Sequence, residues 1–143
     1  MRLLVCGSRM WPDYRRVEAE LVALAPSLVM HGGAKGADEL AGLTCETRGV
    51  PLLVFRADWH HDGKSAGPIR NARMLRDGKP DRGLAFGALW RWIEPTNAIL
   101  ADTHKLTGTG DMVRRMLGAG LPVRWVAAPA MAAVDLTEMP RPT

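Results

Sequence analysis

A glycine-rich turn in the sequence has the residue types and spacing that bind phosphate. The stretch His31-Gly32-Gly33-Ala34-Lys35-Gly36-Ala37-Asp38 follows an apolar run and precedes a helical pattern. Glycines let the backbone approach an anion closely, and the unpaired N–H groups of a first helical turn point toward it. We expect these amides, helped by Lys35, to contact a phosphate, with Asp38 either capping the helix or meeting a ligand hydroxyl. The alternative is a plain turn between a strand and a helix.

Two further turns add cations to the same kind of site. Gly7-Ser8-Arg9 follows the first apolar run, and a guanidinium such as that of Arg9 grips a phosphate with two parallel hydrogen bonds. In Gly67-Pro68-Ile69-Arg70-Asn71, Pro68 suits the first helical position. Arg70 then lies near a helix N-terminus, which is unfavourable for a cation unless an anion is also present. The alternatives are a surface role for Arg9 and a bridge from Arg70 to a carboxylate elsewhere.

Two other segments offer groups suited to a sugar or a base. In Ala57-Asp58-Trp59, the carboxylate of Asp58 can accept from ribose hydroxyls and the indole of Trp59 can stack on a base. The alternative is a solvated acid beside a packed tryptophan. Gly108-Thr109-Gly110-Asp111 opens the last helical pattern and offers amides and a hydroxyl to a phosphate or a ribose, or else forms an ordinary helix cap.

Metal and thiol chemistry are not expected. His60 and His61 are adjacent, and neighbouring histidines on a loop seldom both reach one metal ion. Cys6 and Cys45 do not form a CxxC motif and fit buried, reduced thiols. We therefore predict neither a metal site nor a resident cofactor.

Composition restricts the class of protein. The 143 residues are 47% apolar and 24% charged, which suits one compact domain and excludes disorder. No apolar run approaches the ~20 residues of a membrane-spanning helix, so we expect a cytoplasmic protein without membrane partners. The net charge is +4, and its cations cluster beside the candidate turns rather than in a basic tail. This placement favours a compact anionic ligand over a long nucleic-acid backbone.

The pattern of elements predicts an α/β fold. Strands are expected over residues 3–6, 28–30, 52–55, 82–86 and 122–126. One helix is expected to begin after Asp13, which caps it, and others are expected over residues 38–48, 67–76 and 112–119, with a polar loop over 58–66. This alternation predicts a single domain, residues 1–128, with a Rossmann-like, doubly wound, mostly parallel sheet, whose loops meet at the carboxyl ends of the strands.

Two segments do not follow this alternation. Residues 87–107 suggest an irregular insertion whose Trp90 and Trp92 cover the pocket or form an interface. Residues 129–143 contain three prolines and suggest a loosely ordered, flexible tail.

Taken together and in this order, these motifs resemble the SLOG superfamily, which joins the DNA-processing protein A fold to the "Lonely guy" phosphoribohydrolases. Gly7-Ser8-Arg9, the stretch from Gly32 to Asp38 and Pro68-Ile69-Arg70-Asn71 are similar to its three shared motifs. Ala57-Asp58-Trp59, Gly63-Lys64 and Ala66-Gly67 are most similar to its YspA-type, cpYpsA-related branch. The resemblance covers residues 2–86, and residues 108–126 more loosely.

The resemblance implies a Rossmann-like fold that binds a nucleotide-derived ligand. Our first hypothesis is a sensor or sequestering protein for an ADP-ribose-like molecule, a nucleoside phosphate or a cyclic nucleotide. Ligand sites in such proteins often lie near subunit contacts, so a homo-oligomer is compatible with the resemblance. The expected ligand-binding residues are Gly7, Ser8, Arg9, Gly32, Gly33, Ala34, Lys35, Gly36, Asp38, Asp58, Trp59, Lys64, Pro68, Arg70, Asn71, Gly108 and Thr109.

Two other functions remain open at this point. The first is a phosphoribohydrolase-like enzyme that cleaves a nucleotide N-glycoside, with Asp38, Asp58 or Asp111 as the acid or base. The phosphoribohydrolases have a PGGxGTxxE motif, and here Met112 stands where its glutamate would be. The second is single-stranded DNA binding, although the chain lacks the aromatic-rich basic groove usual for that role.

Overall fold

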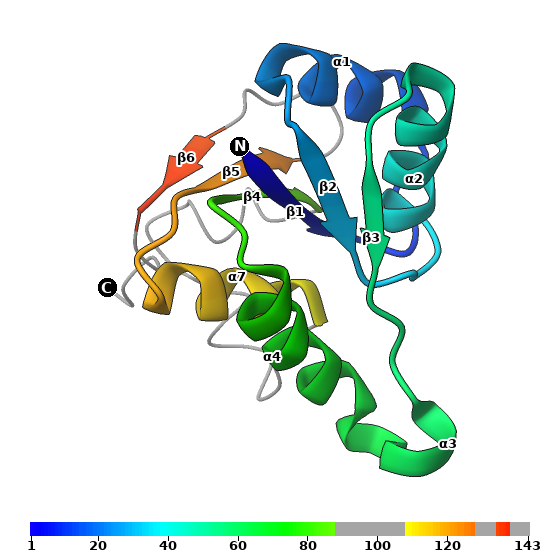
Figure 1. Ribbon diagram of the computed structural model, residues 1–143, viewed down its shortest axis with the longest axis vertical. Helices are drawn as coiled ribbons and strands as arrows, with labels where there is room; N and C mark the ends of the chain where they lie inside the picture. Colours follow the sequence, from blue (N-terminus) through cyan, green and yellow to red (C-terminus); the bar gives the residue numbers. More distant parts are fainter. Residues whose placement is uncertain (88–107, 128–133, 138–143) are drawn as a thin grey trace.

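A six-stranded sheet with the order β3-β2-β1-β4-β5-β6 forms the centre of the molecule. The computed structural model describes residues 1–87, 108–127 and 134–137 (Figure 1). β1 to β5 are parallel, and β6 pairs antiparallel to β5 at the edge. The predicted Rossmann-like α/β class is confirmed. The strands are β1 (Arg2–Gly7), β2 (Leu28–His31), β3 (Leu52–Val54), β4 (Arg82–Gly87), β5 (Val123–Ala127) and β6 (Val134–Leu136).

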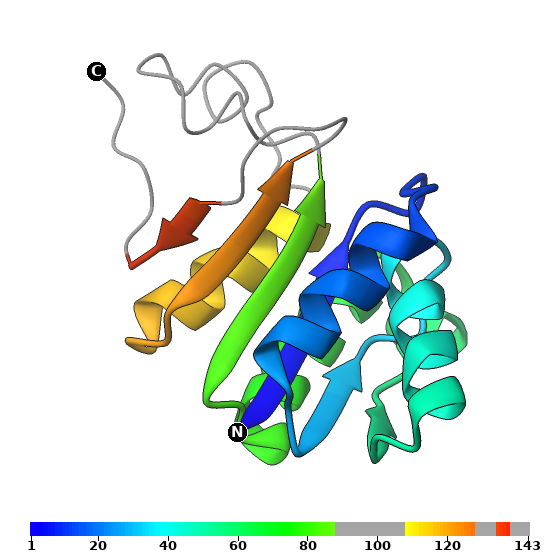
Figure 2. The same cartoon turned by 90° about the horizontal axis from the view of Figure 1, so that it is seen from above.

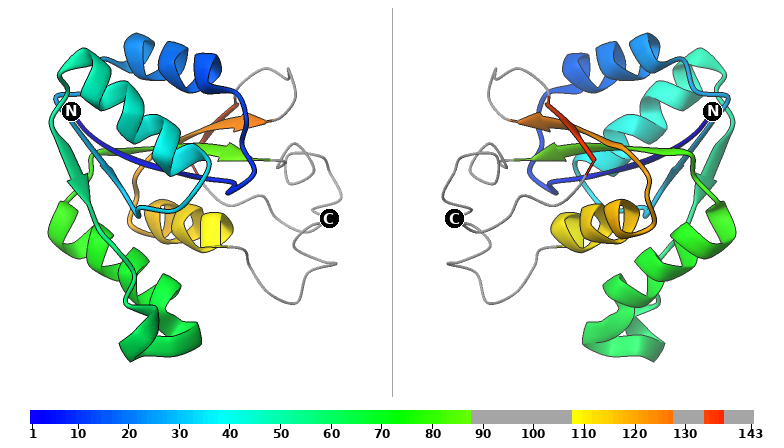
Figure 3. Two further views of the ribbon diagram at one scale, coloured as in Figure 1. Left: turned by 90° about the vertical axis from the view of Figure 1, so that its right-hand side faces the viewer. Right: turned by 90° about the vertical axis from the view of Figure 1, so that its left-hand side faces the viewer.

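Helices cover both faces of the sheet (Figures 2 and 3). α1 (Tyr14–Leu24) and α2 (Ala37–Arg48) pack on one face, and α4 (Ala66–Gly78) and α7 (Gly108–Gly118) on the other. Alternate residues of β1 point to opposite faces, so Leu3 lies in the cluster under α1 and α2 while Leu4 lies in the cluster under α4 and α7. Two apolar layers therefore fix the positions of the helices relative to the strand ends.

The segment predicted as a polar loop over residues 58–66 is largely helical, so that prediction is wrong. It forms α3 (Trp59–Asp62) and the 3-10 turn η1 (Gly63–Ser65), which lead directly into α4. Asp58 caps α3, because its Oδ1 accepts a hydrogen bond from the N–H of His61 at 3.0 Å. Figure 1 shows α3 extending beyond the sheet at the N-terminal end of α4.

The C-terminal part of the chain also differs from expectation. The glycine-containing turn at 108–111 is itself the first turn of α7, rather than a loop before it. Within the segment expected to be loose, Val134–Leu136 forms β6, with Leu136 opposite Val123. The predictions for residues 88–107, with Trp90 and Trp92, lie outside the described residues.

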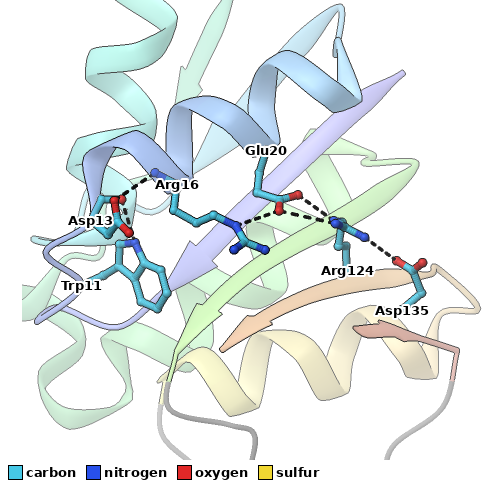
Figure 4. Close-up of polar contacts among 6 residues, drawn as sticks. All are labelled: Trp11, Asp13, Arg16, Glu20, Arg124 and Asp135. Atoms are coloured by element: carbon cyan, nitrogen blue, oxygen red, sulfur yellow. Dashed lines mark hydrogen bonds and ion pairs between the residues drawn. The ribbon is translucent and has the colours of Figure 1, made fainter. Parts of the chain in front are cut away.

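A chain of charges ties α1 to the last two strands (Figure 4). Glu20 of α1 accepts hydrogen bonds from Nε of Arg124 in β5 at 2.6 Å and from Nε of Arg16 at 3.0 Å. Arg82 of β4 donates to Asp135 of β6 at 3.1 Å. As predicted, Asp13 caps α1, its Oδ1 accepting from the N–H of Arg16. No helix among the described residues is both long and apolar enough to cross a bilayer.

Candidate functional site

A cavity of about 490 Å³ opens at the carboxyl ends of β1, β2 and β4. The connections after β1 and β2 place helices on one face and those after β3 and β4 on the other, so the order reverses between β1 and β4. Such a switch point is where ligands bind in open α/β sheets. The lining residues are Val5, Cys6, Gly7, Ser8, Arg9, Met10, Gly32, Ala34, Asp38, Arg70, Asn71, Met74, Gly87, Gly108, Thr109, Met112 and Trp125.

The cavity combines a polar rim with an apolar floor. Each of the three turns identified in the sequence contributes a lining residue to this cavity, namely Arg9, Gly32 and Arg70. The structure therefore brings these motifs together. Sequence analysis missed the floor, which consists of Val5, Cys6, Met74, Met112 and Trp125. These residues lie inside strands and on helix faces, where their apolar character signals core packing and gives no separate sign of a ligand.

The glycine turn uses its amides within the chain. Oδ2 of Asp38 accepts hydrogen bonds from the N–H groups of Gly32 at 3.0 Å and Ala34 at 3.2 Å, and the N–H of Gly33 donates to Nδ1 of His31 at 2.9 Å. These three amides are therefore not directed at a phosphate as expected. Nor does Asp38 cap its helix, because α2 has Gly36 at its N-cap and no side-chain capping bond.

The carboxyl of Asp38 and the imidazole of His31 are both affected by burial. Burial raises the pKa of Asp38 to about 6, against the opposing effect of its two amide bonds and of Arg70. Burial, together with the charges of Arg56 and Arg70, lowers the pKa of His31 to about 4. His31 is therefore neutral at pH 7, consistent with its Nδ1 accepting from Gly33.

Gly36 holds the two turns in contact. Its φ is +74°, and a Cβ there would overlap the backbone of Ser8 and Arg9. The N–H of Ala37 donates to the Ser8 carbonyl at 3.1 Å, and Oγ of Ser8 accepts from the N–H of Met10 at 3.1 Å. Both turns thus form one continuous wall beside the cavity.

Arg70 binds backbone carbonyls rather than a carboxylate. Its Nη1 donates to the carbonyls of Gly32 and Phe55, and its Nε donates to Oδ1 of Asn71 at 2.9 Å. Among the described residues it forms no ion pair, so the alternative of a bridge to a carboxylate finds no support there. Burial lowers the pKa of Arg70, while the charge of Asp38 acts in the opposite direction.

Asn71 connects this wall to α7. Its Nδ2 donates to Oδ2 of Asp111 at 3.0 Å and to the carbonyl of Gly108 at 3.2 Å. Asp111 also accepts from Nε of Arg115 at 2.8 Å and from Arg114 at 3.2 Å. Burial opposes ionisation of Asp111, but the bonds from Arg115 and Asn71 outweigh it and lower its pKa. Asp111 is not part of the cavity lining, and its geometry is that of a structural anion.

Several predicted site residues lie elsewhere. Trp59 on α3 is 52% exposed and packs beside Gly67, whereas Trp125 supplies the indole in the cavity. Lys35 and Lys64 are exposed. Among the described residues, no group of histidine, cysteine or acidic side chains has the arrangement of a metal site. The predicted residues that do not line the cavity are Gly33, Lys35, Gly36, Asp58, Trp59, Lys64 and Pro68.

Fold and cavity together define a Rossmann-like α/β domain with its pocket at the sheet's switch point. The family model described as "YspA, cpYpsA-related SLOG family" matches residues 1–61. The Gene 61 protein of Mycobacterium phage D29 is 36% identical over 135 residues, which cover 85% of this chain and 93% of that protein. The chain belongs to the YspA, cpYpsA-related SLOG family, as its motifs predicted.

Proposed function

We propose that this protein binds a nucleotide-derived, phosphorylated small molecule in the cavity at the ends of β1 and β4. The supporting observation is the juxtaposition of Arg9 and Arg70 on the rim with an apolar floor that includes Trp125. A guanidinium pair suits a phosphate, and an apolar, aromatic surface suits a base. Membership of the SLOG family is consistent with a ligand of this chemical class.

The walls suggest how such a ligand would lie. Its phosphate would approach Arg9 and Arg70, and its base would cover the side chains of Met74, Met112 and Trp125. The loop amides use only Oδ2 of Asp38. Oδ1 of Asp38 and the hydroxyl of Thr109 are therefore the groups that would accept from sugar hydroxyls between these two ends.

A second candidate function is hydrolysis of an N-glycosidic bond. It is favoured by Asp38, whose carboxyl lines the cavity and has a pKa raised to about 6. A carboxyl that holds a proton near neutral pH suits a general acid. Asp58 is exposed and caps α3, and Asp111 is fully engaged on α7, so Asp38 would have to serve this role.

The experiment has two stages. Mass spectrometry of small molecules released from the purified protein identifies a retained ligand, and calorimetry with nucleoside phosphates, ADP-ribose and cyclic nucleotides measures affinity. Arg9→Gln and Arg70→Gln should each weaken binding roughly tenfold or more, because a charge-assisted pair is lost. Arg48→Gln, at the opposite end of α2, is the matched control.

Unchanged affinity in both cavity variants would contradict the proposal. Chromatography of the same mixtures for free base separates binding from hydrolysis, because only an enzyme releases base at many turnovers per protein molecule. Binding that falls steeply with salt and prefers single-stranded DNA to nucleotides would favour the nucleic-acid alternative.

A further inference from the structure

The arginines around the glycine turn share one property, which is that none of them forms an ion pair with a carboxylate of the described residues. Across the described residues, ion pairs with carboxylates are formed by Arg16, Arg48, Arg76, Arg82, Arg114, Arg115 and Arg124. Within the same part of the chain, six arginines form none: Arg2 and Arg15, and the four around the glycine turn, Arg9, Arg56, Arg70 and Arg73. The last four are nevertheless close enough to interact, because Arg9 and Arg73 both lower the pKa of Arg70. Positive charge therefore gathers here, and among the described residues the carboxylates that act on it are those of Asp38 and of Asp77, which itself pairs with Arg76.

Two of these arginines lie outside the cavity. Arg56 follows β3, and its Nη1 is 2.9 Å from the point that a Cβ on Gly33 would occupy. Nη2 of Arg73 donates to the carbonyl of Arg56 at 2.8 Å, and its guanidinium lies 5.9 Å from the centre of the Phe55 ring. Neither Arg56 nor Arg73 lines the cavity. Arg73 is thus held by its hydrogen bond to the carbonyl of Arg56, while the exposed side chain of Arg56 lies against Gly33.

The pair that lines the cavity, Arg9 and Arg70, and the pair outside it, Arg56 and Arg73, lie close to each other at the glycine turn. Arg70 and Arg73 are three residues apart on α4, a spacing that places side chains on the same helix face. Arg70 donates to the carbonyl of Gly32, while Arg56 lies against Gly33. The Gly32–Gly33 peptide is therefore flanked by one guanidinium from each pair, and the absence of side chains at both glycines permits this approach.

We propose that Arg56 and Arg73 form a second anion subsite, and that the ligand is a nucleoside diphosphate or a molecule built on one. This inference rests on the proposed function. One phosphate lies at Arg9 and Arg70, and the next passes over Gly33 to Arg56 and Arg73. Two anionic groups offset the electrostatic repulsion among the four guanidinium groups. A single phosphate in the cavity would offset only the charges of Arg9 and Arg70.

The test compares matched nucleotides by titration calorimetry. The probes are the mono- and diphosphates of adenosine, guanosine, cytidine and uridine, together with inorganic phosphate and pyrophosphate. In the wild-type protein, the diphosphate of the preferred nucleoside should bind roughly tenfold or more tightly than its monophosphate. Arg56→Gln should remove that advantage while leaving monophosphate affinity within about twofold. Arg56→Lys should retain part of the advantage, because it keeps the charge and loses the planar fork.

The control and the outcomes separate this inference from the proposed function. Arg76→Gln, an exposed change near the other end of α4, should bind every probe as the wild type does. Equal affinity for mono- and diphosphates, or equal weakening of both by Arg56→Gln, overturns the second subsite and leaves the cavity proposal standing. Indifference of all nucleotides to both Arg9→Gln and Arg70→Gln overturns the cavity proposal, whereas pyrophosphate binding that depends on Arg56 still supports the subsite. If no nucleotide binds and pyrophosphate is indifferent to Arg56→Gln, both are wrong.

Discussion

The guanidinium of Arg70 lies directly against the backbone of Gly32. Nη1 of Arg70 donates to the Gly32 carbonyl, and a Cβ on Gly32 would fall among the guanidinium atoms. The same nitrogen also reaches the carbonyl of Phe55 at 3.4 Å, so one side chain of α4 connects the ends of β2 and β3. The position of a cation at the cavity therefore depends on the absence of a side chain 38 residues earlier.

Gly32→Ala tests this dependence. The added methyl group displaces the Arg70 guanidinium, which should weaken ligand binding roughly tenfold and lower the free energy of unfolding by about 1–3 kcal/mol. Calorimetry and urea unfolding measure the two effects. Gly118→Ala is the control, because its new Cβ meets nothing within 4 Å and stability should stay within about 0.5 kcal/mol. Full ligand affinity in Gly32→Ala would show that Arg70 is not needed where it lies.

Asp38 predicts a particular dependence of stability on pH. Burial raises its pKa from 3.8 to about 6 in the folded protein, so the folded state holds the proton more firmly than the unfolded state does. The contribution is present below pH 3.8 and is lost as pH rises through about 6, which lowers the free energy of unfolding by about 3 kcal/mol. Urea unfolding between pH 3 and pH 8 measures this loss.

Asp38→Asn provides the comparison. Only Oδ2 of Asp38 accepts from the amides of Gly32 and Ala34, so the carbonyl oxygen of asparagine can take its place. The variant should therefore fold, and its stability relative to wild type should rise as pH increases from about 4 to about 7. Parallel pH profiles for the two proteins would show that Asp38 does not titrate in this range.

Sequence alone predicted the parts of the site that depend on backbone conformation and charge. Glycines at 32, 33 and 36 and the cations Arg9 and Arg70 are unusual enough in a strand-helix alternation to mark a ligand wall, and the structure gathers Gly32, Arg9 and Arg70 at one cavity. The mostly parallel sheet was also predictable, since continuous apolar runs alternating with helical patterns favour parallel strands.

The rest depended on tertiary contacts that no local pattern encodes. Asp38 has the spacing of a helix cap, but the turn folds back so that its carboxylate meets the amides of Gly32 and Ala34 instead. Trp59 was the indole expected at a base, but it is exposed on α3, whereas Trp125, which reads as a core residue of a strand, lines the cavity. Arg56 belongs to no glycine motif, and its position beside Gly33 is a tertiary contact that the sequence does not reveal.

The charge network between α1 and β5 should affect stability alone. Glu20 has an 8% exposed side chain and binds both Arg16 and Arg124. Glu20→Ala leaves Arg16 without its anion and Arg124 with Asp135 as its remaining partner, so it should lower the free energy of unfolding by about 1–3 kcal/mol. Ligand affinity of the folded fraction should stay at the wild-type value, because none of these residues lines the cavity. A loss of affinity at a temperature where the variant is folded would contradict this separation.

Both thiols should be inert in the folded protein. Cys6 and Cys45 are buried, and burial raises the pKa of Cys45 to about 11 and that of Cys6 still further. Little thiolate is therefore present at pH 8, although Cys6 lines the cavity. Titration with a chromogenic disulfide should detect two thiols in denaturant and only slow reaction without it. Rapid labelling of Cys6 in native protein would show that the cavity floor is open to reagents and its thiol ionised.

Asp111 distinguishes a structural acid from a catalytic one. It accepts from Asn71, Arg114 and Arg115 and has a lowered pKa, so its contribution to stability is present above pH 3.8 and is lost as pH falls through the folded value. Asp111→Asn should lower the free energy of unfolding at pH 7 by about 2–4 kcal/mol, with the difference shrinking at acid pH. If nucleotides are hydrolysed, a general acid or base at this position requires a fall in kcat of about 100-fold or more. A structural anion instead predicts that the folded variant retains its kcat to within a few-fold, because Asp111 acts on the cavity only through Asn71 and Arg70.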